Sequence, residues 1–163
     1  MSSAKNLLRQ SIEMGHFVTR AYVEDLSDAN LLVRSTPGAN HIAWQLGHII
    51  GSIRGMLAGL GQPAPALPEG FEAAYTRETA GSDDPAKFAT KAQYLALLDQ
   101  MKAASLAAVE ATPESSLDAP GPESMREYAP TIGAVLMLLG SHLLMHAGQF
   151  VPIRRKLGKP PLF

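Results

Sequence analysis

The chain has 163 residues, a length typical of one domain with its own hydrophobic core, so we expect a single domain over residues 1–163. Its 46% hydrophobic and 18% charged residues indicate a globular protein, and its net charge of −1 gives no electrostatic basis for binding nucleic acid or an anionic membrane. Because the chain contains no cysteine, disulfides, thiolate metal sites and cysteine nucleophiles are excluded.

Two helices are expected in the first third of the chain. Apolar residues recur near a 3.6-residue period over residues 3–26, which predicts the first helix. Asn40 is a favourable N-cap for a second helix that runs to about Leu60. Three prolines then follow within six residues, so we expect residues 61–85 to form a long surface connection, and such connections often shape a binding site.

Two more helices are expected after this connection. The third begins near residue 84, with its strongest helical pattern over residues 90–110. Thr131 can cap a fourth helix that ends near Leu157, and this helix is apolar on almost every side over residues 132–145. Apolar and polar residues do not alternate with period two over any long stretch, so the pattern predicts an all-α fold. Four helices of this length predict a four-helix bundle, and the apolar fourth helix is expected in the middle of it.

The fourth helix closes with three basic residues, Arg154, Arg155 and Lys156. We favour their interaction with the negative end of the helix dipole over an anion site, since so short a motif is weak evidence for a ligand. The apolar stretch before them is shorter than the about 20 residues that a membrane span needs, and the N-terminal residues lack the apolar core of a signal peptide. We expect a cytoplasmic protein without a nucleic-acid or membrane partner.

Two histidines, His142 and His146, interrupt the apolar fourth helix. At four residues' separation they stand only about 40° apart around the helix, which lets one helix offer two imidazole nitrogens to one metal ion. The alternative is that each is a buried residue with its own hydrogen-bond acceptor, and the spacing alone leaves both interpretations open.

A third metal ligand has to come from another helix. The second helix carries His41 and His48, which are seven residues apart and share one face, with Trp44 at the edge of that face. We expect His48 to lie in the bundle core and His41 near its rim, where it could line a pocket. His16 on the first helix is expected to be a boundary residue without a role in the site. Three histidines with open coordination positions would form a catalytic rather than a structural type of site.

Two segments carry a resemblance to a known family. PGANHIAWQLGHIIGSIRGML and the later SHLLMHAGQFVPIRRKLGKPPL resemble the DinB-like (damage-inducible) superfamily of four-helix-bundle metalloproteins, which shares its bundle with bacillithiol and mycothiol transferases. The pattern consists of a Trp, a Gly-His pair on the second helix, and a late HxxxHxGQ followed by a basic turn. The resemblance implies a DinB-like bundle in which His48, His142 and His146 bind the metal.

The donor set and the resemblance together indicate which metal and which partners to expect. Imidazole ligands and the order of intrinsic affinities favour zinc or nickel, with iron and manganese as alternatives. We expect a small-molecule substrate, with a low-molecular-weight thiol as a candidate partner, and a homodimer. His41, Trp44 and Gln149 are the candidates for substrate binding, and no catalytic residue beyond the ligands is assigned.

Glycines recur every four residues on the second helix, at Gly47, Gly51, Gly55 and Gly59. Each destabilises a helix interior by roughly 1 kcal/mol relative to alanine, so a compensating close approach is expected. We favour tight helix packing, within the bundle or across a homodimer, over a substrate channel.

Three functional hypotheses follow. The leading one is a metal-dependent enzyme that activates a thiol or a water for transfer or hydrolysis on a small molecule. The second is a non-catalytic bundle that binds a metal or a small molecule, for example in a stress response. In the third, the histidines are simply buried parts of a structural bundle.

Overall fold

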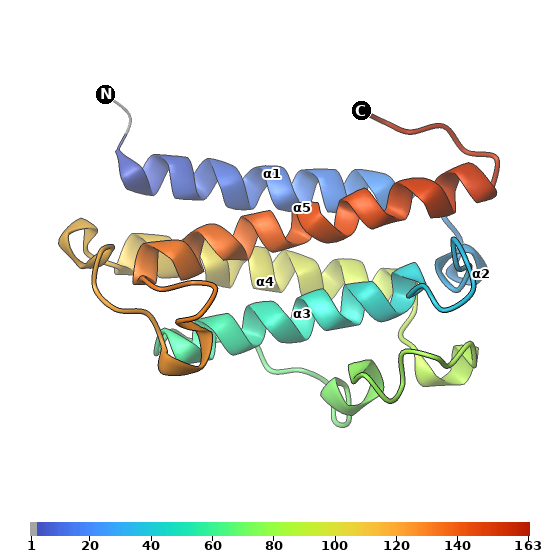
Figure 1. Ribbon diagram of the computed structural model, residues 1–163, viewed down its shortest axis with the longest axis horizontal. Helices are drawn as coiled ribbons and strands as arrows, with labels where there is room; N and C mark the ends of the chain where they lie inside the picture. The colour runs from blue at the N-terminus through green and yellow to red at the C-terminus, as the bar shows by residue number, and fades with distance from the viewer. Residues whose placement is uncertain (1–2) are drawn as a thin grey trace.

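The computed structural model describes residues 3–163; Met1 and Ser2, which the expected domain includes, lie outside the described residues. Its long helices are α1 (Ala4–Glu24), α3 (Ile42–Gly59), α4 (Lys91–Ala111) and α5 (Ile132–Lys156), which pack as a bundle (Figure 1). The all-α four-helix bundle expected from the sequence is confirmed. A short helix α2 (Asp28–Leu31) was not expected, and the β pairing within residues 3–163 is one isolated bridge between Pro120 and Thr131.

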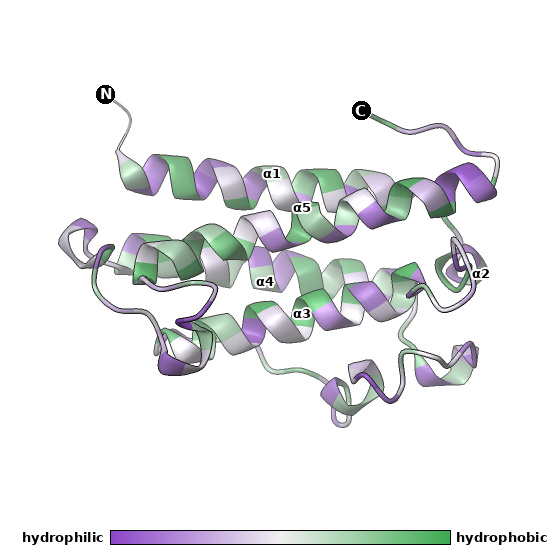
Figure 2. Cartoon of the chain, viewed as in Figure 1, coloured by the Kyte–Doolittle hydropathy of each residue, from purple (hydrophilic) through white to green (hydrophobic). Residues whose placement is uncertain are grey.

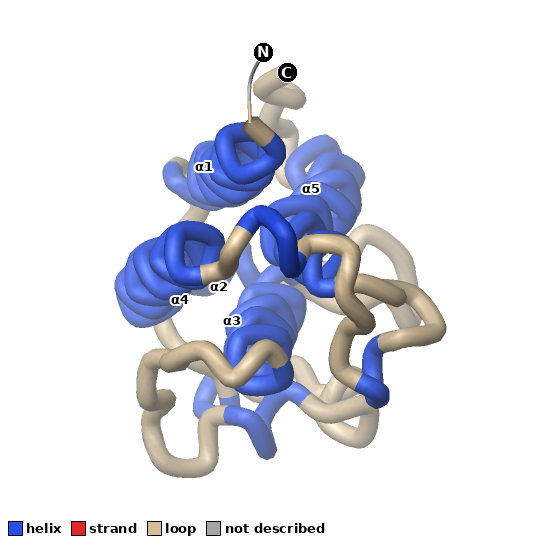
Figure 3. The backbone as a smooth tube through the Cα atoms, turned by 90° about the vertical axis from the view of Figure 1, so that its left-hand side faces the viewer, coloured by secondary structure: helices blue, strands red, loops and turns tan. Residues whose placement is uncertain are grey.

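The four long helices surround the core in the order α1, α5, α3 and α4. Seen end-on, α1 and α3 lie at opposite corners, and each packs against both α4 and α5 (Figure 3). The direction of the chain shows that α1 and α5 run parallel to each other and antiparallel to α3 and α4 (Figure 1). The two facing helices α3 and α5 are therefore antiparallel, and they provide the histidines discussed below.

The ends of the helices are set by side chains that cap free backbone N–H groups. Ser3, Thr90 and Thr131 each accept a hydrogen bond from the backbone three residues later, at the starts of α1, α4 and α5. The expectation that Asn40 caps the second helix is wrong, because the cap is His41, whose Nδ1 accepts from the Trp44 backbone N–H at 3.0 Å. An imidazole nitrogen can act in this way only when it is unprotonated.

The parallel arrangement of α3 and α4 explains the long connection between them. The chain leaves α3 at one end of the bundle and has to return along the length of α3, about 27 Å at 1.5 Å per residue, before α4 can begin. Residues 60–90 make this return and lie beside α3 (Figure 1). They contain the 3₁₀ turns η1 (Glu72–Tyr75) and η2 (Pro85–Lys87), so the third long helix does not begin near residue 84.

The segment between α4 and α5 also approaches α3. It contains the 3₁₀ turns η3 (Glu114–Ser116) and η4 (Glu123–Met125). It crosses to the C-terminal end of α3, where Pro122 and Met125 pack beside Gly59 (Figure 1). The space between α3 and α5 is therefore bordered by residues from outside the four helices.

Helices α1 and α5 make the closest contact of the bundle, at Gly15 and Gly140. A Cβ atom added to Gly15 would lie 2.4 Å from the Gly140 carbonyl oxygen, and one added to Gly140 would lie 2.5 Å from the Ser11 backbone. Any side chain at either position would push the two backbones apart. The glycines thus allow α5 to pack tightly against α1, while its opposite side faces α3.

The core is built mainly from Leu, Ile, Val and aromatic side chains of all four helices. Helix α5 is hydrophobic around most of its first half and hydrophilic at its C-terminal end (Figure 2). By length and composition α5 could cross a membrane. It packs against α1, α3 and α4 in the bundle.

Arg154, near the end of α5, is 1% exposed and makes an ion pair. Its guanidinium donates to Asp25 Oδ1 at 2.5 Å, to the Tyr22 carbonyl oxygen at 2.9 Å and to the Pro160 carbonyl oxygen at 3.2 Å. Hydrogen bonds from Arg154 and then Lys159 lower the pKa of Asp25 to about 2. Arg154 therefore ties α5 to the end of α1 and to the C-terminal tail, a role that neither the helix-dipole nor the anion-site interpretation described.

Candidate metal centre

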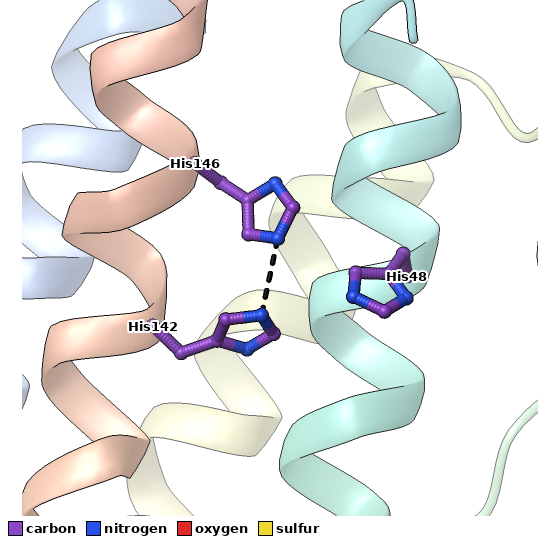
Figure 4. A group of neighbouring side chains, drawn as sticks. All are labelled: His48, His142 and His146. Carbon is purple, nitrogen blue, oxygen red and sulfur yellow. Dashed lines mark hydrogen bonds between the residues drawn. The ribbon is translucent and has the colours of Figure 1, made fainter. Parts of the chain in front are cut away.

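His48 from α3 and His142 and His146 from α5 meet in the space between the two helices (Figure 4). One ligand atom from each ring lies within 4.8 Å of the others, and all three side chains are half-buried. His142 Nε2 and His146 Nε2 are 3.1 Å apart. A tetrahedral ion with bonds of about 2.05 Å needs nitrogens roughly 3.4 Å apart, so small side-chain movements would suffice to bind one.

Gln45 fixes the orientation of His146. The Gln45 side chain is 1% exposed, and its amide nitrogen donates to the Asn40 carbonyl oxygen at 2.8 Å. Its Oε1 is therefore free to accept from His146 Nδ1, at 2.9 Å. With the proton on Nδ1, His146 presents the lone pair of Nε2 toward the other two histidines. A metal-ligating histidine usually has such a partner for its second nitrogen.

Burial keeps all three imidazoles neutral at pH 7. Desolvation, followed by the neighbouring His142 and His48, lowers the pKa of His146 to about 3. Desolvation, followed by His48, lowers the pKa of His142 to about 4, and desolvation also lowers the pKa of His48. Neutral imidazole is the form that binds metal ions, so no proton has to be removed for binding at neutral pH.

The donor set fits a divalent transition metal better than a closed hydrogen-bond network. His142 Nδ1 is buried and has no hydrogen-bond partner among the described residues. Buried polar atoms of a structural network are normally satisfied. The described residues supply three nitrogen donors to this group, which leaves at least one position open on a four-coordinate ion, as in catalytic sites.

Trp44, one helical turn before His48 on α3, packs against the His48 ring. The indole stacks on the imidazole with ring centroids 5.2 Å apart and an interplanar angle of 5°. The indole Nε1 donates to the Thr76 carbonyl oxygen at 3.1 Å, so the connection after α3 helps to position Trp44. His48 is thereby restricted in the ring positions that it can adopt.

Two cavities adjoin the histidines. The larger, of about 660 Å³, lies between α3, α5 and the segment before α5, and His48 and His142 form part of its wall. The smaller, of about 230 Å³, lies between α3 and η1 and shares His48 with the larger one; Glu72 and Tyr75 line its outer side. His48 thus borders both cavities, whereas His142 borders the larger one.

The four glycines of α3 divide into two pairs. A Cβ atom at Gly47 would lie 2.1 Å from the Tyr75 ring, and one at Gly59 would lie 3.2 Å from Pro122. The contacts of this pair are with connecting segments, not with another long helix. A Cβ atom at Gly51 or Gly55 would meet no atom within 4 Å, and these two glycines line the smaller and the larger cavity. Tight helix packing within the chain therefore does not account for this second pair.

The other residues singled out from the sequence lie in different places. His41 is fully buried, and its Nε2 is 3.0 Å from the Ser82 carbonyl oxygen, so the expected position near the rim is wrong. Gln149 is exposed, whereas Gln45, which the sequence analysis missed, contacts His146. His16 is 7% exposed between α1 and α4, away from the three-histidine group. A role of His41, Trp44 and Gln149 in substrate binding stays a prediction.

The family model of the DinB superfamily matches residues 13–150. The chain belongs to the DinB superfamily. The match covers α3 and most of α5, and so includes all three histidines of the group. None of the curated protein sequences matches the chain.

Two solved structures share the fold of this DinB protein. A conserved protein from Enterococcus faecalis has 15% sequence identity and a TM-score of 0.69, over 98% of this chain and 100% of that chain. YfiT from Bacillus subtilis, described as a probable metal-dependent hydrolase with an unusual four-helix bundle topology, has 18% identity and a TM-score of 0.64, over 95% of this chain and 88% of that chain. These matches establish the DinB/YfiT-like fold.

Proposed function

We propose that the protein is a metal-dependent enzyme that promotes hydrolysis of, or thiol transfer to, a small molecule. The observation that carries this proposal is the convergence of three neutral imidazoles, with an open coordination position, beside a cavity of about 660 Å³. The description of YfiT as a probable metal-dependent hydrolase supports the same class of reaction. A divalent ion held by His48, His142 and His146 would supply Lewis acidity and lower the pKa of a coordinated water or thiol.

The protein's own residues have defined tasks in this proposal. Gln45 keeps the proton of His146 on Nδ1, so that Nε2 points toward the other ligands. Trp44 restricts His48 by stacking, and the apolar walls of the larger cavity reduce the amount of water around the reacting atoms. We also propose zinc or nickel as the ion, with iron or manganese as alternatives, and a homodimer as the assembly.

One observation favours a second candidate, a non-catalytic small-molecule-binding protein. The residues that line the larger cavity include no Asp, Glu, Lys or Arg. Apart from the two candidate ligands, the only groups there that carry an exchangeable proton are the hydroxyls of Ser52 and Tyr128. In this alternative the metal and the cavity bind a ligand without turnover.

Metal analysis followed by activity measurements would test the proposal. The untagged protein should contain about one equivalent of metal by elemental mass spectrometry, and the His142→Ala/His146→Ala double variant should contain none. The loaded protein should turn over model esters or transfer a thiol to a model electrophile, lose this activity with a chelator and regain it with the metal. Metal without turnover would favour the binding protein, and no metal after reconstitution would contradict both functions.

A further inference from the structure

The walls of the larger cavity are mostly apolar, in contrast to the polar imidazoles of His48 and His142, which also line it. Its side chains are Met56, Met125, Leu138, Tyr128 and Met145, together with Ser52 and the two histidines. They come from α3, α5 and the segment between α4 and α5, so three parts of the chain contribute apolar surface to one space. Its volume lies within the range of roughly 300–1,000 Å³ that is common for small-molecule sites.

The charge of these walls restricts what can bind. No acidic side chain, lysine or arginine belongs to the residues that line the cavity. In the metal-free protein, an ionised carboxylate, phosphate or ammonium group would lose hydration on entry and would find no counter-ion on these walls. Methionine side chains are flexible and polarisable, and they adapt to apolar ligands of different shapes. The walls thus favour an uncharged apolar molecule.

The outer part of the cavity is apolar as well. Tyr128 is 64% exposed and Met145 is 63% exposed, although both line the cavity. They therefore lie where the cavity meets the solvent. A ligand entering there would contact hydrophobic side chains before it reached His48 and His142. An apolar ligand would therefore make favourable contacts from the mouth of the cavity to the histidines.

Gly55 limits the width of this space. A Cβ atom added at Gly55 would meet no atom of the chain within 4 Å, and any longer side chain there would occupy volume of the cavity. Gly148 on α5 is a natural comparison, because it is exposed like Gly55 and also has open space around a Cβ atom, but it does not line the cavity. The same substitution at the two glycines should therefore have different effects on a ligand.

We propose that the larger cavity is the substrate site, that it takes an uncharged apolar small molecule such as a neutral ester, and that Gly55 sets the size of the molecule accepted. The inference rests on the proposed function, since it is the histidine group at the inner end that makes the occupant a substrate. It adds the chemical class of that substrate and the residue that determines specificity.

Binding to the metal-free protein would test this proposal separately from catalysis. The probe is Nile red, a neutral dye whose emission shifts to the blue in apolar surroundings. The wild type should bind it, and methyl hexanoate should displace it at a concentration at least tenfold lower than hexanoate does. Turnover by the zinc-loaded protein is measured in parallel and reports on the proposed function only, so that the two can fail independently.

A matched pair of variants would locate the dye. Gly55→Leu should weaken dye binding at least tenfold, whereas Gly148→Leu should leave it within twofold of the wild type, with both folds checked by circular dichroism. If Gly55→Leu does not fold, Gly55→Ala should still raise the concentration of methyl hexanoate needed for displacement at least threefold. Equal displacement by ester and carboxylate, no dye binding by the wild type, or equal binding by the two leucine variants would overturn the proposal.

Discussion

Replacing Gln45 with leucine should weaken metal binding without removing a ligand. In the wild type, the Gln45 side chain holds the proton of His146 on Nδ1 through a hydrogen bond of 2.9 Å. Leucine cannot accept this bond, and at 1% exposure the position admits little water to replace it. His146 would then be free to adopt the other tautomer, in which the proton occupies the nitrogen that faces the other histidines.

The expected loss of affinity is 10- to 100-fold, or about 1.4–2.7 kcal/mol, as is typical for removal of a hydrogen-bond partner of a ligating histidine. The assay is a competition titration of the metal-free variant with zinc and a chromogenic chelator. Gln45→Glu keeps an acceptor at the same place and should bind zinc at least as tightly as the wild type.

Gln149→Leu is the matched control, because this glutamine is exposed. Its zinc affinity should remain within about twofold of the wild type, as expected for a change at an exposed side chain. Gln45 also donates to the Asn40 carbonyl oxygen, so the stability of each metal-free variant has to be measured as well. If a folded Gln45→Leu protein binds zinc as tightly as the Gln149→Leu control, the assigned role of Gln45 is incorrect.

Three further outcomes are expected. Burial lowers the pKa of His16 to about 4, so as the pH falls from 6.5 the unfolded chain takes up a proton at His16 before the folded chain does. Between pH 7 and 4.5, the unfolding free energy of the metal-free wild type should therefore fall by roughly 2 kcal/mol more than that of His16→Leu, as measured by urea titration. Equal losses would contradict the lowered pKa of His16. Arg154→Met should reduce the unfolding free energy by about 2 kcal/mol, because it removes the hydrogen bonds of the buried guanidinium. The loss is limited to this size because Asp25 is half-exposed and stays hydrated without its partner. In the control Arg155→Met, the side chain is exposed, and the unfolding free energy should change by less than about 0.5 kcal/mol. Zinc should raise the melting temperature of the wild type, as any ligand of the native state does, and His142→Ala should abolish the shift; an undiminished shift would place the zinc elsewhere.

Much of the fold could be predicted because local patterns determine helices. Thr131 caps α5 as its position indicated, and Gly158, with φ of 70°, follows the last helix. The cap of α3 could not be predicted in this way. Asn40 is the better cap by propensity, but His41 is buried against the returning connection, and its Nδ1 is the nitrogen that points at the free backbone N–H group.

The histidine pair on α5 could be interpreted from spacing because both residues lie on one helix, whose geometry is local. His48 required the resemblance to the DinB superfamily, since nothing in the local pattern relates α3 to α5. Gln45 was missed because its role depends on that same relation. The signal was present in the sequence as a polar residue within an apolar helix, three positions before His48.

By itself the sequence determined the helical class, most helix boundaries and the pairing of His142 with His146, because each depends on residues within a few turns of one helix. The tertiary structure decided the parallel course of α3 and α4, the ion pair of Arg154 with Asp25, and the cavity beside the histidines. It also decided that Gly47 packs against Tyr75 while Gly55 stays open. The physical reason is that these features arise from contacts between segments far apart in the chain, which the helical periodicity of one segment does not specify.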